Sequence, residues 1–265
     1  MDLGLKNATA VVVGGGRGMG LAGARCLAGD GARVALVGRT RAVLDRAAED
    51  LTARGSPDAL GLVADTENAA QVQGVFDQLG ERWNGQLNIL VNAVGPTVRG
   101  TFDDLTDDQW RQAVDEGVMG MVHCVRSALP LLRQADWARI VNFSAHSTQR
   151  QSVILPAYTA AKAMVTSISK NLSLLLAKDE IMVNVVSPGS IASEALVGWA
   201  ESVGVDGGDP YALMSAIDKH FGHPAHLPRA GLPDEIGPVV AFLASRRNSY
   251  MTGANINVDG GSDFT

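Results

Sequence analysis

The chain has 265 residues, of which 46% are hydrophobic and 19% are charged, and its formal net charge is −6 at pH 7. This composition predicts a globular protein with a sizeable core, and the negative charge argues against general binding to nucleic acid or to an anionic membrane. The two cysteines imply no disulfide framework. The N-terminus lacks a signal-peptide pattern and no apolar run reaches membrane-spanning length, so we expect a cytoplasmic protein.

Strand and helix patterns alternate along the chain. Short apolar runs predict strands at residues 10–13, 32–38, 59–64, 87–94, 139–144, 181–187 and 254–258. Helical spacing of apolar residues predicts helices at 21–28, 41–54, 67–82, from 106 to about 134, at 158–178 and at 233–245. Alternation of this kind predicts one α/β domain over residues 1–265, with a doubly wound parallel sheet and helices on both faces.

A glycine-rich turn joins the first predicted strand to the first helix. Residues 10–20 read A-V-V-V-G-G-G-R-G-M-G. Glycines let the chain turn sharply and let a ligand approach the backbone, and the start of a helix favours an anion such as a pyrophosphate. The spacing Gly14-x3-Gly18-x-Gly20 differs from the common G-x-G-x-x-G, so a tight connection without a ligand is the alternative.

The end of the second predicted strand carries positive charge. Its sequence is Gly38-Arg39-Thr40-Arg41, without an acidic residue. A carboxylate at this point usually holds the ribose 2′-hydroxyl of NAD, whereas an arginine accommodates a 2′-phosphate. With Arg17 as a second cation, the sequence favours NADP(H), with NAD(H) as the other cofactor to consider and solvated surface arginines as the alternative interpretation.

The long segment at about 190–228 contains prolines and glycines together with apolar and aromatic side chains. We expect it to form a substrate lid with one or two short helices, and a subunit-contact flap is the alternative. Within it, His220, His223 and His226 recur every third residue. Gly222 and Pro224 break any helix that would align them, so we expect no metal site.

Tyr158 and Lys162 are four residues apart in a predicted helix, so they share one face. An ammonium beside a phenol favours the phenolate, and a lowered pKa would make Tyr158 a usable general acid or base. Such a pair is common by chance, and its meaning depends on the motifs around it.

These motifs together resemble those of the short-chain dehydrogenases/reductases over the whole chain. The matching segments are the glycine turn, Asn92-Ala93-Val94-Gly95, Tyr158-x-x-x-Lys162, Pro188-Gly189, Arg229-x-Gly231-x-Pro233-x-Glu235-Ile236 and Thr252-Gly253-x5-Asp259-Gly260-Gly261. The resemblance implies a Rossmann-type sheet of about seven strands and hydride exchange between a nicotinamide cofactor and a ketone or alcohol. It also implies a homodimer or homotetramer, with a small molecule as substrate.

The resemblance also assigns a cofactor site. Asp65 would meet the adenine, Asn92 and Gly95 the adenosine ribose region, and Lys162 the nicotinamide ribose. The full set comprises Gly14, Gly16, Arg17, Gly18, Met19, Gly20, Arg39, Asp65, Thr66, Asn92, Val94, Gly95, Tyr158, Lys162, Pro188, Gly189, Ile191 and Ser193.

Two of the family's four usual catalytic residues are absent. The family places a serine thirteen residues before the tyrosine, where this chain has Ala145, and an asparagine where it has Gly117. Ser144 is the nearest substitute for the serine and Ser147 the next. We therefore expect Tyr158, Lys162 and Ser144 to be catalytic in a ketone reductase whose substrate is hydrophobic or cyclic. The alternative is a catalytically impaired dinucleotide-binding protein that acts as a sensor or partner subunit.

Overall fold

The computed structural model describes residues 2–222 and 224–262. In this part of the chain, seven parallel strands form one sheet in the order β3-β2-β1-β4-β5-β6-β7. The strands are β1 (Thr9–Val13), β2 (Arg33–Gly38), β3 (Ala59–Val63), β4 (Ile89–Asn92), β5 (Ala138–Phe143), β6 (Ile181–Pro188) and β7 (Asn255–Val258). The order reverses direction between β1 and β4, which is where doubly wound sheets bind ligands. The predicted fold class is confirmed.

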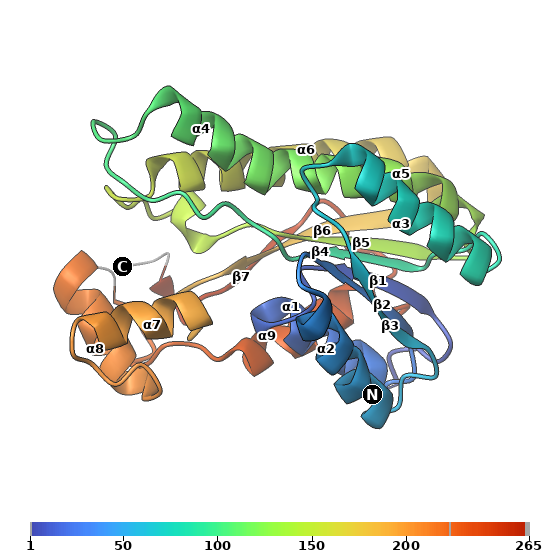
Figure 1. Cartoon of the computed structure of the whole chain (residues 1–265), viewed down its shortest axis with the longest axis horizontal. Helices are drawn as coiled ribbons and strands as arrows, with labels where there is room; N and C mark the ends of the chain where they lie inside the picture. The colour runs from blue at the N-terminus through green and yellow to red at the C-terminus, as the bar shows by residue number, and fades with distance from the viewer. Residues whose placement is uncertain (1, 223, 263–265) are drawn as a thin grey trace.

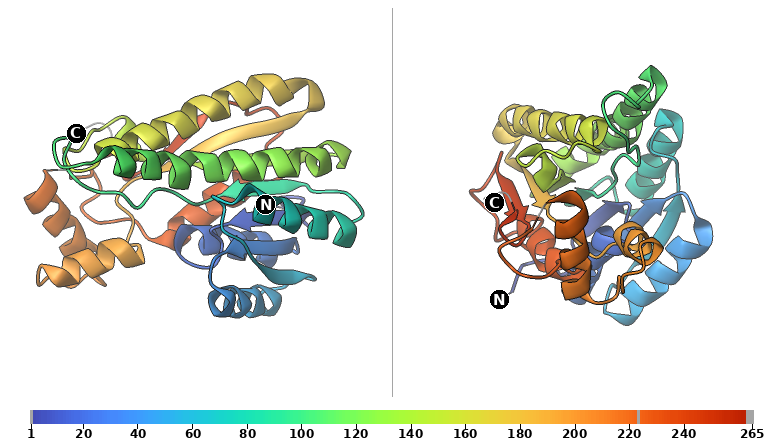
Figure 2. Two further views of the ribbon diagram at one scale, coloured as in Figure 1. Left: turned by 45° about the horizontal axis from the view of Figure 1, so that its top comes forward. Right: turned by 90° about the vertical axis from the view of Figure 1, so that its left-hand side faces the viewer.

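Helices cover both faces of this sheet (Figure 1). They are α1 (Gly18–Gly29), α2 (Arg41–Ala53), α3 (Ala69–Arg82), α4 (Asp107–Val114), α5 (Gly120–Gln134), α6 (Pro156–Leu176), α7 (Glu194–Ser202), α8 (Pro210–Phe221) and α9 (Pro233–Leu243). Helices α3 to α6 lie on one face, and α1, α2 and α9 lie on the other (Figures 1 and 2). No helix in the described ranges is both long and apolar enough to cross a membrane.

The two faces of the sheet contribute to two separate cores. Successive side chains of a strand point to opposite faces, and β1 follows this rule with buried residues throughout. Val11 and Val13 pack with the side chains of α3, α5 and α6, whereas Val12 packs with those of α1, α2 and α9. The apolar run of β1 is therefore continuous because both of its faces are covered.

Residues 190–228 leave the carboxyl end of β6 and form α7 and α8, which project beyond the end of the sheet (Figure 2). Both expected short helices are present. They share a small core of their own, centred on Ala200, Leu213, Met214 and Ile217. Helices α7 and α8 thus form a small packed unit near the carboxyl end of β6.

A π-helical turn, Asp115–Met119, interrupts the predicted long helix between α4 and α5. Gly117 lies in this turn, and a Cβ there would stand 2.8 Å from Cδ of Pro96 and 3.3 Å from Cβ of Ala161. The proline ring thus occupies the space into which a larger side chain at position 117 would extend. The departure from the family at Gly117 is coupled to Pro96, which directly follows Gly95.

We expect Gly117→Ala to lower the free energy of unfolding by about 1–3 kcal/mol, because the added methyl group meets a rigid proline ring. Gly74→Ala is the matched control, since Gly74 lies in α3 with open space around it and should gain up to about 1 kcal/mol from helix propensity. Urea unfolding measures both variants, and Pro96→Ala should relieve the cost of Gly117→Ala. Equal stabilisation by both alanine substitutions would show that Pro96 does not restrict position 117.

Candidate active site

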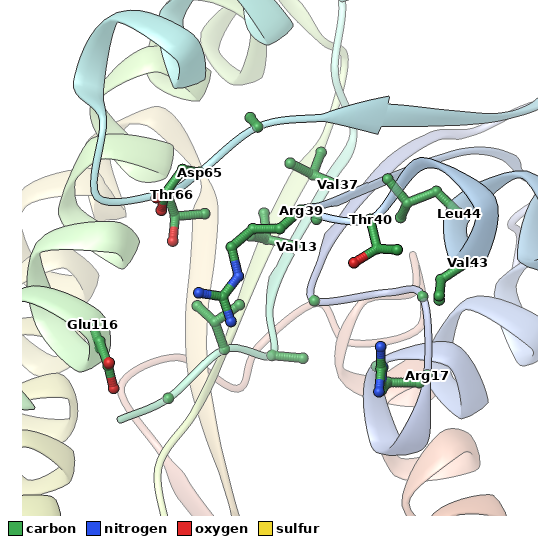
Figure 3. Close-up of a pocket in the computed structure, with 18 of the residues that line it drawn as sticks. Val13, Arg17, Val37, Arg39, Thr40, Val43, Leu44, Asp65, Thr66 and Glu116 are labelled. Carbon is green, nitrogen blue, oxygen red and sulfur yellow. The ribbon is translucent and has the colours of Figure 1, made fainter. Parts of the chain in front are cut away.

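A cavity of about 490 Å³ opens at the carboxyl ends of β1 to β4 (Figure 3). Its floor is the glycine turn, where Gly14 has a φ of +75° that a residue with a side chain rarely adopts. A Cβ on Gly14 would stand 2.9 Å from the carbonyl oxygen of Ala93, and a Cβ on Gly20 would collide with the carbonyl oxygen of Gly14. The glycines therefore keep this turn tight and its backbone open to the cavity.

Ten of the expected cofactor residues line this cavity. They are Gly14, Gly16, Arg17, Met19, Gly20, Arg39, Asp65, Thr66, Val94 and Gly95. The cavity is also lined by residues that the sequence did not single out as binding residues, among them Thr40, Val43, Leu44, Glu67, Thr97 and Glu116. Thr40 directly follows Arg39, but Glu116 comes from the π-helical turn, and only the folded chain brings it here.

Charged side chains of both signs face this cavity. Arg39 extends into it, with Glu116 on one side and Arg17 on the other (Figure 3). Burial acts to raise the pKa of Glu116, but hydrogen bonds from Gln112 and from the backbone and hydroxyl of Thr97 lower it on balance. Arg41 is directed elsewhere: its Nη1 donates to the carbonyl oxygen of Gly61 at 2.7 Å.

Lys162 is buried beside this cavity, with only 3% of its surface exposed. Its Nζ donates to the carbonyl oxygens of Val94 (3.1 Å) and Phe143 (2.8 Å), at the ends of β4 and β5. A Cβ on Gly95 would stand 2.7 Å from this nitrogen, so a side chain there would displace the ammonium. Burial lowers the pKa of Lys162 from 10.5 to about 8.

Tyr158 lies in the first turn of α6, one turn before Lys162. Within the described residues, its hydroxyl forms no hydrogen bond, so it is available to a ligand. Burial raises the pKa of Tyr158, and the charge of Arg99 acts against this rise. The lowered pKa that Lys162 was expected to give Tyr158 is therefore not found, because burial outweighs the charge of Arg99.

The expectation that Ser144 replaces the missing serine is not supported. Its Oγ is buried, donates to the carbonyl oxygen of Lys162 at 3.0 Å and accepts from Oγ1 of Thr166 at 2.8 Å. Ser147 is also buried, and its Oγ accepts from Oγ1 of Thr159 at 3.1 Å. Both hydroxyls contact α6, and the proton of Ser144 is already donated in that contact, whereas Ser147 is held there as an acceptor.

Asn92 supports the site from below rather than lining the cavity. It is 2% exposed, and its Nδ2 donates to Oδ1 of Asn142 at 2.8 Å. Asn142 in turn donates to Oγ of Ser169, at 2.9 Å. This buried chain fastens β4 and β5 to α6. Oδ1 of Asn92 has no hydrogen-bond partner among the described residues, and the ribose contact expected of Asn92 stays a prediction.

The remaining expected residues follow β6 or lie next to the cavity. Gly189 packs against Asp259, to whose Cα a Cβ would come within 2.6 Å. Ile191 is buried in the sheet core, and Ser193 caps α7 by accepting from the backbone N–H of Leu196. Gly18 borders a second hollow. Pro188, at the end of β6, accepts a hydrogen bond at its carbonyl oxygen from Nδ1 of His146 (3.2 Å), which joins β6 to the loop after β5.

The described histidines of residues 190–228 take part in packing. His220 stacks edge-on against Trp199, with ring centroids 5.6 Å apart, and the ring of His226 lies against Gly261. His223 lies outside the described residues. Over the described ranges, no group of three side chains has the arrangement of a metal site.

Comparisons with known proteins agree with this arrangement. The family profile described as enoyl-(acyl carrier protein) reductase matches residues 13–263. Meso-2,3-butanediol dehydrogenase of Serratia marcescens is 30% identical, over 97% of this chain and 96% of its own length. The 3alpha-hydroxysteroid dehydrogenase of Mediterraneibacter gnavus is 30% identical, over 97% of each chain.

A solved structure gives the same result. L-sorbose reductase from Gluconobacter frateurii, crystallised with NADPH and L-sorbose, superimposes with a TM-score of 0.91 at 30% identity, covering 99% of this chain and 98% of its own. The parallel sheet, the glycine turn, the Tyr158–Lys162 pair and these matches lead to one conclusion. The chain belongs to the short-chain dehydrogenase/reductase family of oxidoreductases.

Proposed function

We propose that this protein transfers a hydride between NADP(H) and a ketone or secondary alcohol, with Tyr158 as general acid and base. The observation that supports this most strongly is the hydrogen bond from Nζ of Lys162 to the carbonyl oxygen of Val94. Val94 also lines the cavity at the glycine turn. The Tyr158–Lys162 pair is therefore fixed to the same backbone segment that would hold the cofactor.

The cavity suits a phosphorylated dinucleotide. Its glycine turn leads into the N-terminus of α1, which favours a pyrophosphate, and its volume is in the usual range for a ligand site. Arg17 and Arg39 border it, and no carboxylate directly follows β2. These features favour NADPH over NADH, because a guanidinium pairs with a 2′-phosphate.

Tyr158 and Lys162 take separate roles in this proposal. The reduced nicotinamide supplies a hydride to the carbonyl carbon when it is bound. The hydroxyl of Tyr158 donates its proton to the carbonyl oxygen, which gives the alcohol and leaves a phenolate. The raised pKa keeps Tyr158 protonated at neutral pH. In the proposed role of Lys162, its ammonium one turn along favours the phenolate that forms.

We propose a hydrophobic or cyclic ketone as the substrate, with residues 190–228 as a lid and a homodimer or homotetramer as the assembly. Two loops meet at the start of α6, where the N–H of Gly100 donates to the carbonyl oxygen of Ile154 at 3.0 Å. They expose Phe102 (71%) and Val153 (82%), which supports an apolar substrate. Relatives named for a diol and a steroid, and a neighbour named for a sugar, make ketones of several sizes worth testing.

A second candidate function is binding of the cofactor without catalysis. Ala145 and the inward-turned hydroxyls of Ser144 and Ser147 favour this alternative. The retained Tyr158 with its free hydroxyl favours the enzyme. A missing oxyanion donor costs about 100-fold or more in rate, so the proposed reductase should be slow but measurable.

Oxidation of NADPH and of NADH across a panel of cyclic, steroidal and sugar ketones tests the proposal. We expect ketone-dependent consumption with NADPH, and a loss of at least about 100-fold in Tyr158→Phe, because the phenylalanine has no proton to donate. Cofactor affinity should change little in this variant. The absence of any ketone-dependent rate above that of Tyr158→Phe would favour the binding function, and equal measurable rates would remove Tyr158 as the acid.

The pKa of Lys162 predicts a pH-dependent contribution to stability. Because its folded pKa is about 8 and its unfolded value is 10.5, the unfolded state binds more protons between these values, so stability rises with pH in this window. Relative to Lys162→Met, the free energy of unfolding should gain on the order of 3 kcal/mol from pH 8 to 10.5. Urea unfolding measures both proteins across this pH range. Parallel profiles for the unsubstituted protein and Lys162→Met would show that the pKa of Lys162 is not lowered by folding.

A further inference from the structure

Arg17 borders two hollows and is already paired in one of them. It lines the cavity at the glycine turn and also a second hollow of about 480 Å³ between α1, α2 and the start of α7. Glu194 lines only the second. Nη1 of Arg17 donates to Oε2 of Glu194 at 2.7 Å, and both side chains are more than half exposed.

This ion pair joins the lid segment to the cofactor cavity. Glu194 is the first residue of α7, and Ser193 before it caps the helix. On its other side, α7 packs on α8 through Trp199 and Phe221, whose ring centroids are 4.7 Å apart. The far end of the segment is held separately, by Arg150, which donates to the carbonyl oxygens of Gly222 and Pro224.

We propose that Glu194 competes with the cofactor's 2′-phosphate for Arg17, so that binding of the phosphorylated cofactor releases the first turn of α7. The inference rests on the proposed NADP(H) function. A dianionic phosphate on the Arg17 guanidinium would face the Glu194 carboxylate, and like charges at one cation repel. An exposed ion pair is weak enough to exchange for a phosphate. A cofactor without the phosphate leaves the pair intact.

Glu194 is therefore a specificity-determining residue that lowers the preference for NADPH over NADH. It also makes the attachment of α7 depend on which of the two cofactors is bound. Arg39 is the second guanidinium that can hold the phosphate from within the cavity. Glu67 and Glu116 also line the cavity, but Glu116 is engaged by Thr97. Glu194 is the carboxylate that forms an ion pair with Arg17.

Titration calorimetry with NADPH, NADH, 2′,5′-ADP and 5′-AMP tests this. Glu194→Gln should bind NADPH and 2′,5′-ADP about two- to fivefold more tightly, as expected from loss of an exposed ion pair, and should bind NADH and 5′-AMP unchanged. Glu201→Gln, which removes the same charge from the other end of α7, is the matched control and should change none of the four affinities.

A second substitution separates competition for Arg17 from a general charge effect. In an Arg17→Gln background, Glu194→Gln should no longer tighten NADPH, whereas an undiminished gain there would overturn the proposal. Hydrogen exchange is an independent readout. The amides of residues 194–202 should exchange faster with 2′,5′-ADP than with 5′-AMP, and equal exchange with the two ligands would contradict release of α7.

The outcomes also distinguish this inference from the proposed function. If the unsubstituted protein binds NADPH more tightly than NADH but Glu194→Gln changes neither, the competition fails and the cofactor proposal stands. If the unsubstituted protein binds no nicotinamide cofactor, or prefers NADH, both fail.

Discussion

The site depends on the buried ammonium of Lys162 and the two carbonyl oxygens that receive its hydrogen bonds. These oxygens belong to Val94 and Phe143, so one side chain of α6 ties together the ends of β4 and β5. Burying a cation without a counterion is costly, and the lowered pKa is the sign of that cost. A side chain at Gly95 would displace this ammonium, and Val94, which accepts one of its hydrogen bonds, also lines the cavity.

The two departures from the family have different physical consequences. At Gly117, the proline ring of Pro96 occupies the neighbouring space, so the local packing is complete without the asparagine. At Ala145, the nearest hydroxyl does not compensate, because the Ser144 proton is donated to the backbone of α6. The proposed reaction therefore relies on Tyr158 and Lys162 to a greater degree than it would with the serine in place.

Much of the fold followed from local patterns in the sequence. Apolar runs such as 32–38 and 181–187 became strands β2 and β6, and the glycine turn became the floor of the cavity. These predictions succeed because apolar periodicity and glycine geometry act over a few neighbouring residues. One or two short helices between 190 and 228 were also expected, and two are present.

What the sequence could not provide depends on contacts between distant segments. Glu116 lies in the π-helical turn and lines a cavity made mostly by the first four strands. The direction of the Ser144 hydroxyl is set by Thr166 and by the backbone of Lys162. The pKa of Tyr158 moved opposite to expectation because burial, which cannot be deduced from four-residue spacing, outweighs charge.

The central claim is that Tyr158 faces a nicotinamide held beside the backbone segment that anchors Lys162. A crystal structure of the protein with NADPH and a ketone analogue tests this most directly. We expect the hydroxyl of Tyr158 within about 3 Å of the carbonyl oxygen, and the 2′-phosphate at Arg39. A structure with the hydroxyl turned away from the nicotinamide, or with the cofactor bound outside this cavity, would contradict the assignment.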